Sequence, residues 1–201
     1  MNEKTPELRF EGFSGNWESK RLSDLKDVRD GTHDSPKFHN QGYPLVTSKN
    51  LTEYGLDITN VSYISLEDFE AINKRSKVNI GDIIFGMIGT IGKPIIVDRD
   101  DFAIKNIALI KNGGEISNEF LIQNLKSQIF KDYIYVENTG NTQKFLSLSK
   151  IRDYVLLVPS LEEQEKIGEF FRVFDEDINL NKTKLEKLKE LKKGYLQKMF
   201  V

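Results

Sequence analysis

The chain has 201 residues, which fits one ordinary domain with an appendage, since single domains run to roughly 100–200 residues. Hydrophobic residues at 38% and aromatic residues at 10% can build a real core, which excludes a wholly disordered chain. A formal net charge of −2 gives no general attraction to nucleic acid or to an acidic membrane, so any such binding must be local. The lack of Cys excludes disulfides and thiolate sites, and with a polar start that has no signal peptide it leads us to expect a cytoplasmic protein.

Residues 1–160 are predicted to form short strands and helices. The candidate strands are runs of β-branched and aromatic residues between turn residues, at 44–47, 58–64, 82–85, 94–97, 103–109 and 154–158. One helix is predicted from Ser65 and another from Ser117 through about Val136, each capped by its serine. Apolar residues recur at helical spacing in the second helix and are expected to face the core: Leu121, Leu125, Ile129, Tyr133 and Val136. The elements do not repeat as strand–helix–strand units, which favours an α+β fold.

Residues 160–201 predict a single long helix after Pro159. Ser160 and Glu163 match a capping box, in which each side chain binds the other residue's backbone N–H. Apolar residues then recur every three, four or seven positions over a length of about 60 Å. A domain of this size cannot bury so long a helix, so the apolar seam needs a partner helix. The seam comprises Ile167, Phe171, Phe174, Ile178, Asn181, Leu185, Leu188, Lys192, Tyr195 and Met199, with Asn181 and Lys192 as polar register positions.

Charge along this helix predicts the direction of its partner. Residues 162–177 contain seven acidic and two basic residues, whereas residues 182–198 contain seven lysines and two glutamates. Two antiparallel copies would place each acidic half beside the other copy's basic half, and parallel copies would place like charges together. The alternative is that the charges only complement the helix dipole, but that dipole acts over the terminal turns alone.

The sequence contains no recognisable catalytic or cofactor motif. Residues 86–93 resemble a phosphate-binding loop, but Met87 occupies a required Gly position and Pro94 follows Lys93 where Ser or Thr is needed. A tight turn between strands is the favoured interpretation, with Thr90 and Lys93 able to contact a DNA backbone. His33 and His39, without any Cys, make a poor metal site. We therefore expect a binding protein with no catalytic residues, no metal and no cofactor.

A series of motifs covers nearly the whole chain. They are Trp17 with Leu22, DGTHDSPK at 30–37, GDII at 81–84, GTIGK at 89–93, TGNTQKFL at 139–146, Pro159 with QEKI at 164–167, FDEDI at 174–178 and KKGYLQKMF at 192–200. Together and in this order they resemble the specificity subunit of type I restriction-modification systems. One motif departs from the family pattern, because Asn141 stands inserted in the loop that usually reads Gly-Thr-x-Gln.

The resemblance implies a protein that does no chemistry itself. It implies double-stranded DNA as ligand, a methyltransferase subunit and a restriction translocase subunit as partners, and S-adenosylmethionine and ATP bound by those partners. The usual member has two target-recognition domains and two long helices, whereas this chain has one of each. We therefore expect residues 1–159 to be one target-recognition domain and residues 160–201 to form an antiparallel coiled coil in a homodimer, which also docks the methyltransferase.

DNA contacts are expected in the loops, where polar side chains can reach bases and lysines can reach phosphates. The candidates are Thr32, His33, Ser35, Lys37, Lys49, Asn50, Thr90, Lys93, Asn141, Thr142, Gln143 and Lys144. Asp30, Gly31 and Pro36 are expected to shape a turn, and Gln143 can equally serve to brace one. Residues shared across a family with diverse targets are poor base readers, so the readers can instead lie in 38–54 or 98–111.

Two alternative functions remain open at this point. The chain can be a truncated or decoy subunit that occupies the methyltransferase without directing it. An independent enzyme, such as a small nuclease, is the alternative from another class, and the loose Glu190 and Lys192 pair on the long helix is better explained as solvated surface.

Overall fold

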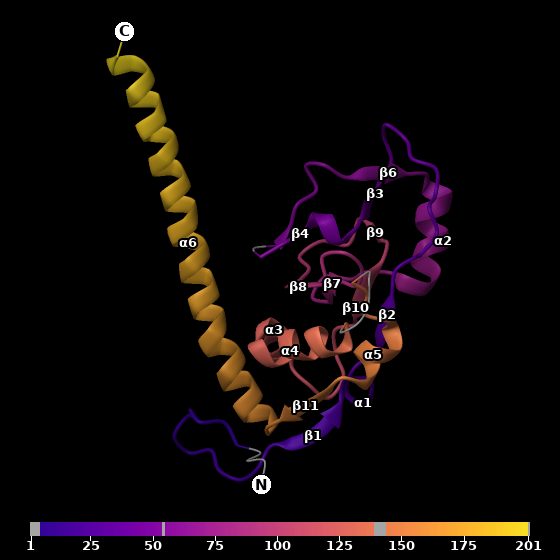
Figure 1. Ribbon diagram of the computed structural model, residues 1–201, viewed down its shortest axis with the longest axis vertical. Helices are drawn as coiled ribbons and strands as arrows, with labels where there is room; N and C mark the ends of the chain where they lie inside the picture. The colour runs from indigo at the N-terminus through magenta and orange to yellow at the C-terminus, as the bar shows by residue number, and fades with distance from the viewer. Residues whose placement is uncertain (1–4, 54, 139–143, 201) are drawn as a thin grey trace.

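A four-stranded antiparallel sheet lies at the centre of the computed structural model, which describes residues 5–53, 55–138 and 144–200 (Figure 1). Its order is β2 (Val28–Asp30), β10 (Ile107–Ile110), β7 (Ile83–Gly86) and β8 (Gly92–Ile96). Ile83 and Phe85 point into one core and Ile84 into another, because successive side chains of a strand alternate between faces. Both faces are therefore covered, which explains why the central strands read as unbroken apolar runs.

Helices cover one face of this sheet. They are α1 (Leu22–Leu25), α3 (Asn118–Lys126), α4 (Gln128–Glu137) and α5 (Leu148–Asp153). Phe130 packs edge-on against Phe85 and Tyr154, with ring centroids 5.6 and 4.9 Å apart. Strands β1 (Glu18–Arg21) and β11 (Val155–Val158) form an antiparallel pair, which brings the start of the domain's chain next to its end, just before the long helix.

Shorter elements cover the other face. A three-stranded sheet has the order β6 (Ser62–Ile64), β3 (Tyr43–Val46) and β9 (Ala103–Ile104), with β3 and β9 parallel. Helix α2 (Leu66–Ser76) packs on it, and its Phe69 ring stacks 4.2 Å from the Tyr43 ring. A 3-10 turn, η1 (Ser48–Asn50), leads into the hairpin of β4 (Leu51–Thr52) and β5 (Gly55–Leu56).

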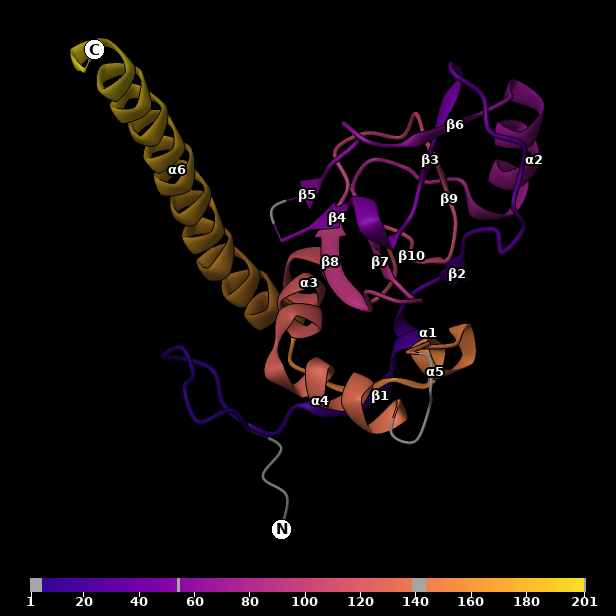
Figure 2. The ribbon, with the colours of Figure 1, turned by 45° about the horizontal axis from the view of Figure 1, so that its top comes forward.

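Helix α6 (Leu161–Met199) is one continuous helix that leaves the domain beside α3 (Figures 1 and 2). The predicted long helix and the α+β class are thus confirmed. Ser160 accepts a hydrogen bond from the Glu163 N–H at 3.4 Å, but the Glu163 carboxylate binds Arg9 instead of completing a capping box. No helix in the described part of the chain is long and apolar enough to cross a membrane.

The helix predicted from Ser117 to Val136 is two helices. Ser127 has extended backbone angles, φ −66° and ψ 166°, and separates α3 from α4. This break changes the phase of the apolar stripe, so Leu121 and Leu125 are buried while Phe130 replaces Ile129 in the core. The expectation that Ile129 and Val136 face the core was wrong, because their side chains are 68% and 66% exposed.

The strand predicted at 103–109 is also divided. Asn106 has φ 55°, in the left-handed region that Asn tolerates better than most residues, and it ends β9 before β10 begins. The two halves then join different sheets. Of the strand predicted at 58–64, only Ser62–Ile64 is a strand, and β1, β2, β4, β5, α1 and α5 were not predicted.

Candidate nucleic-acid interface

Loops that are distant in the sequence meet around Met87 and Asn106. The Asn106 N–H donates to the Thr32 carbonyl at 3.0 Å, and the Met87 N–H donates to the Asn106 carbonyl at 3.2 Å. The Leu146 N–H in turn donates to the Met87 carbonyl at 2.9 Å, and the Gly89 N–H donates to the Lys144 carbonyl at 3.2 Å. Backbone hydrogen bonds therefore place the predicted loops 31–37, 86–93 and 144–146 next to one another. They are joined through Asn106, which lies in the segment 98–111 that the sequence offered as an alternative source of base readers.

The loop at 47–50 lies in the same region. Lys105 donates its N–H to Val46 at 2.9 Å, and Gly86 lies against Ser48. A Cβ at Gly86 would lie 2.7 Å from the Ser48 hydroxyl and 2.2 Å from the Thr90 carbonyl oxygen, so only Gly allows the two loops to approach this closely. Residues of these loops and of β6 line a shallow hollow, among them Phe38, Lys49, Ser62, Ile88, Lys105 and Asn106.

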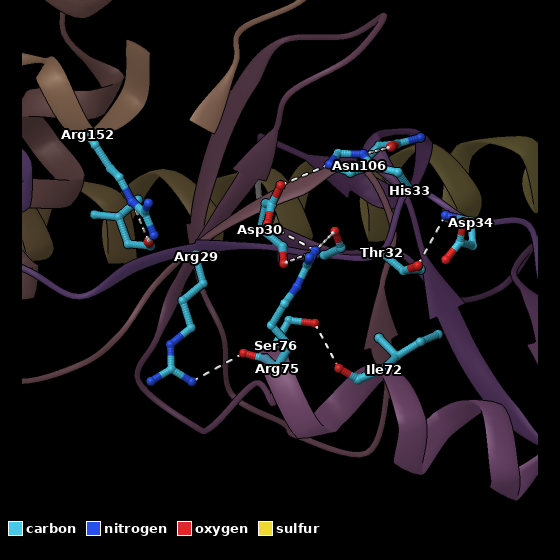
Figure 3. A network of polar contacts seen from close by, with 12 residues as sticks. Arg29, Asp30, Thr32, His33, Asp34, Ile72, Arg75, Ser76, Asn106 and Arg152 are labelled. Atoms are coloured by element: carbon cyan, nitrogen blue, oxygen red, sulfur yellow. Dashed lines mark hydrogen bonds and ion pairs between the residues drawn. The ribbon is translucent and has the colours of Figure 1, made fainter. Parts of the chain in front are cut away.

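His33 is held by a polar network at one side of this region (Figure 3). Its Nε2 lies 2.9 Å from Asp30 Oδ2 and its Nδ1 lies 2.8 Å from Asn106 Oδ1. Arg75 of α2 donates to the other Asp30 oxygen at 3.1 Å and to the Gly31 carbonyl at 3.0 Å. The ring remains half-exposed, so the network orients His33 without removing it from solvent.

Most of the predicted contact residues in the described loops are accessible. Lys105 Nζ approaches the Ser35 hydroxyl at 2.5 Å, and the Thr32 hydroxyl accepts a hydrogen bond from the Asp34 N–H at 3.1 Å. Thr90 is exposed, and four exposed lysines make no salt bridge with any residue of the described ranges: Lys37, Lys49, Lys93 and Lys144. Asn141, Thr142 and Gln143 lie outside the described residues.

Asn50 is an exception, because its side chain is buried. Its Oδ1 accepts from the Thr47 N–H at 3.0 Å, and its Nδ2 donates to the carbonyls of Asp57 and Asn60 at 3.1 and 3.2 Å. With 6% exposure and these partners, the amide braces the loop and is not presented to DNA, which corrects the expectation for this residue. The pKa of Asp57 is lowered by hydrogen bonds from the hydroxyl and the N–H of Thr59, which keep the bracing segment in place.

The candidate surface also includes side chains that were not among the predicted contact residues. Lys105, Asn106 and Arg75 lie beside the predicted loops, yet the local sequence around them carries no turn or phosphate-binding signal. Lys105 and Asn106 fall within 98–111, which together with 38–54 was the alternative source of base readers, whereas Arg75 lies outside both segments. The described residues contain no cluster of three or more His, Asp or Glu side chains placed to hold a metal ion.

Comparison with known proteins identifies the family. A family-wide sequence pattern described as the type I restriction modification DNA specificity domain matches residues 14–190. The chain belongs to this family. As a DNA-specificity domain it is a recognition module, not a catalytic subunit, which argues against the small-nuclease alternative.

Similar proteins agree with this assignment. The chain is 28% identical to the putative type I restriction enzyme MjaX specificity subunit of Methanocaldococcus jannaschii, over 92% of this chain and 45% of that protein. The S subunit from M. genitalium superposes with a TM-score of 0.63 at 18% identity, covering 92% of this chain and 46% of that one. A chain from a type I restriction-modification system, solved to explain complex assembly and conformational transition, gives 0.59 at 15% identity, with 94% and 45% covered. The chain spans about half the length of the relatives it matches.

Proposed function

We propose that this chain reads one half of a bipartite DNA site and pairs with a second copy through α6, so that the dimer directs a methyltransferase subunit and a restriction translocase to a symmetric sequence. Residues 1–159 act as the target-recognition domain, and residues 160–201 serve dimerisation and methyltransferase docking. The observation that carries the proposal is the row of exposed apolar side chains along a helix that is continuous for 39 residues.

The apolar seam is open to a partner along most of the helix. Ile167 packs against the core of its own domain, and the remaining seam positions are exposed: Phe171, Phe174, Ile178, Asn181, Leu185, Leu188, Lys192, Tyr195 and Met199. A contiguous exposed apolar stripe of this length is typical of an interaction surface. A second copy is the partner that fits best, because antiparallel pairing joins the acidic half of each helix to the basic half of the other.

The loops around Met87 and Asn106 form the DNA-facing surface in this proposal. Exposed Lys37, Lys49, Lys93 and Lys144 contact phosphates, and the polar side chains between them contact base edges. The overall charge of −2 opposes DNA, so the isolated chain binds DNA weakly and with strong salt dependence. Tight and specific binding then requires the assembled methyltransferase, and tight binding by the isolated dimer at physiological salt would contradict this part of the proposal.

Sedimentation of the purified chain at micromolar concentration tests the dimer. We expect the wild type to be dimeric and L185D/L188D, which places charges in the seam, to be monomeric. T183D/Q197D adds the same charge outside the seam and should remain dimeric. If the wild-type chain is monomeric even with the methyltransferase present, the proposal is refuted.

The helix pair also sets the distance between the two half-sites. Inserting one helical turn of about 5.4 Å near Asn181 should change the preferred spacer by one or two base pairs, since DNA rises roughly 34 Å per ten base pairs. Methylation mapping of cells that carry the lengthened chain and its methyltransferase provides the readout. An unchanged spacer would refute the idea that the helices act as a ruler.

A decoy subunit is the second candidate function, since the same exposed helix can occupy a methyltransferase without directing it. Co-expression separates the two. Methylation at a symmetric site supports a directing subunit, whereas loss of a resident system's methylation without a new site supports a decoy.

A further inference from the structure

The first turns of α6 pack very closely against the start of α3 (Figure 2). Gly168 is the point of nearest approach. A Cβ at this position would lie 2.7 Å from the Glu119 Cβ, 3.1 Å from the Glu119 carbonyl carbon and 3.2 Å from the Phe120 nitrogen. Two of these three atoms belong to the backbone of α3, so they cannot move aside as a flexible side chain would. Any other residue at 168 must push the two helices apart.

Polar contacts fix the helix on either side of Gly168. On the N-terminal side, Arg9 donates to both Glu163 oxygens at 2.7 and 2.8 Å, and Gln164 Oε1 accepts from the Ser117 N–H at 2.9 Å. On the C-terminal side, the Asp175 carboxylate accepts from Gln123 and Lys126 of α3 at 3.1 and 2.9 Å. Glu163 is only 1% exposed, which makes the first of these contacts part of the interior.

The N-terminal segment supports the helix from a second direction. The Phe10 ring packs edge-on against the Phe170 ring, with centroids 5.5 Å apart. Contacts with α3 and with residues 9–10 thus fix the N-terminal part of α6, while its C-terminal part diverges from the domain (Figures 1 and 2). A helix held at its base and extended beyond it acts as a lever, so a small change at Gly168 becomes a large displacement at Met199.

We propose that Gly168 is a specificity-determining position, which sets the angle between the recognition domain and α6 and thereby the spacer length that the dimer accepts. This inference rests on the proposed function. In this proposal Gly168 does not contact DNA, and it acts as a positioning residue.

The expected displacement is comparable with one base pair. If Ala at 168 shifts the helix by roughly 0.7 Å over the roughly 10 Å between residues 168 and 175, the helix tilts by about 4°. Over the remaining length of about 36 Å between residues 175 and 199, the far end then moves by about 2.5 Å. One base pair rises about 3.4 Å, so the change is large enough to alter which spacer fits.

The test compares G168A with G194A in the complex with the methyltransferase subunit. Gly194 lies on the same helix outside the seam, and a Cβ there would meet nothing within 4 Å, so it is a matched control for the effect of Ala on the helix itself. The complexes methylate a DNA library in which inverted half-sites are separated by spacers of every length. We expect G168A to move the preferred spacer by about one base pair, or to change the ratio between adjacent spacers about tenfold, and G194A to match the wild type.

A rescue variant separates a geometric effect from general damage. E119G removes the nearest atom to the new Cβ, so G168A/E119G should return towards the wild-type spacer, whereas a merely destabilised protein would not recover. If G168A does not yield a folded complex, D175A takes its place. It releases the contact with Gln123 and Lys126 without adding an atom, and it should broaden the range of accepted spacers.

The inference would be overturned if G168A showed the same spacer preference as the wild type. Where G168A does not fold, the same result in D175A would overturn it. Either outcome would leave the proposed function intact. A wild-type complex that methylates but shows no preference among spacers would instead refute the proposed function, and this outcome is visible before any variant is made.

Discussion

The globular domain and helix α6 differ in how far their apolar side chains are buried. In the domain, Phe85, Phe102 and Phe130 are fully buried, and the central sheet has a core on each face. Along α6, side chains of similar size, such as Phe174, Ile178 and Leu188, are more than half exposed. Apolar side chains thus hold the domain together within one chain, whereas those of the helix are suited to a contact with another chain.

Truncation of core and seam residues should sharpen this comparison most. F85A leaves a cavity in a close-packed core, and it should lower the free energy of unfolding by about 3–5 kcal/mol. L188A removes an exposed side chain, so in dilute monomeric protein it should change that free energy by less than about 0.5 kcal/mol. Denaturant unfolding at low protein concentration measures both, and a large effect of L188A there would mean that the helix belongs to the domain's own core.

The two Arg–Glu pairs of α6 provide the next comparison, because one lies at the buried base of the helix and the other on its exposed shaft. R9A leaves the Glu163 carboxylate in the interior without its partner and should cost about 2–4 kcal/mol, since Arg9 itself keeps some solvent contact. R172A removes a solvent-exposed pair with Glu176 and should cost less than about 0.5 kcal/mol. Similar values for the two variants, measured by thermal unfolding, would contradict this account of the junction.

The neighbouring residues Lys49 and Asn50 test which side chains of the DNA-facing loops contact DNA and which only stabilise the loop. N50A removes a buried amide and should cost about 1–3 kcal/mol of stability. K49A should leave stability unchanged and weaken DNA binding with a smaller salt dependence, because one phosphate contact is lost. Unfolding and salt-titrated binding are measured on both variants, and binding loss in N50A without loss of stability would restore Asn50 as a direct contact.

The effect of Lys26 appears only in the pH dependence of stability. Burial lowers the pKa of Lys26 from 10.5 to about 8, although Glu119 and Asp82 partly oppose the shift. Between these values the unfolded chain holds the Lys26 proton more tightly, so this residue makes the free energy of unfolding rise from about pH 8 to pH 10.5. K26M should lack that rise.

The difference between wild type and K26M isolates Lys26 from other groups that titrate. Burial raises the pKa of Tyr133 and Tyr154 to about 12, which lowers stability as the pH exceeds 10 in both proteins equally. Urea unfolding at several values between pH 7.5 and 10 provides the curve. Parallel curves for the two proteins would show that Lys26 is not buried as the structure has it.

The sequence predicted the long helix well because its signals are local. Ser160, the apolar spacing and the absence of Pro act within a few turns of one another, and the helix appears from Leu161 to Met199. The break at Ser127 and the turn at Asn106 carry no strong local signal, so one predicted helix and one predicted strand were each divided. Strands such as β1, with the sequence ESKR, depend on a partner more than 130 residues away, and no local pattern announces them.

By itself the sequence determined that this protein has a domain with its own core, a long helix with an unburied seam and a division of charge along that helix, because periodicity and composition are properties of neighbouring residues. Only the tertiary structure decided which loops meet around Met87 and Asn106, that Asn50 supports a loop, and that Gly168 lies against the backbone of α3. Such contacts join residues far apart in the chain, and they depend on how the buried sheet aligns its neighbours.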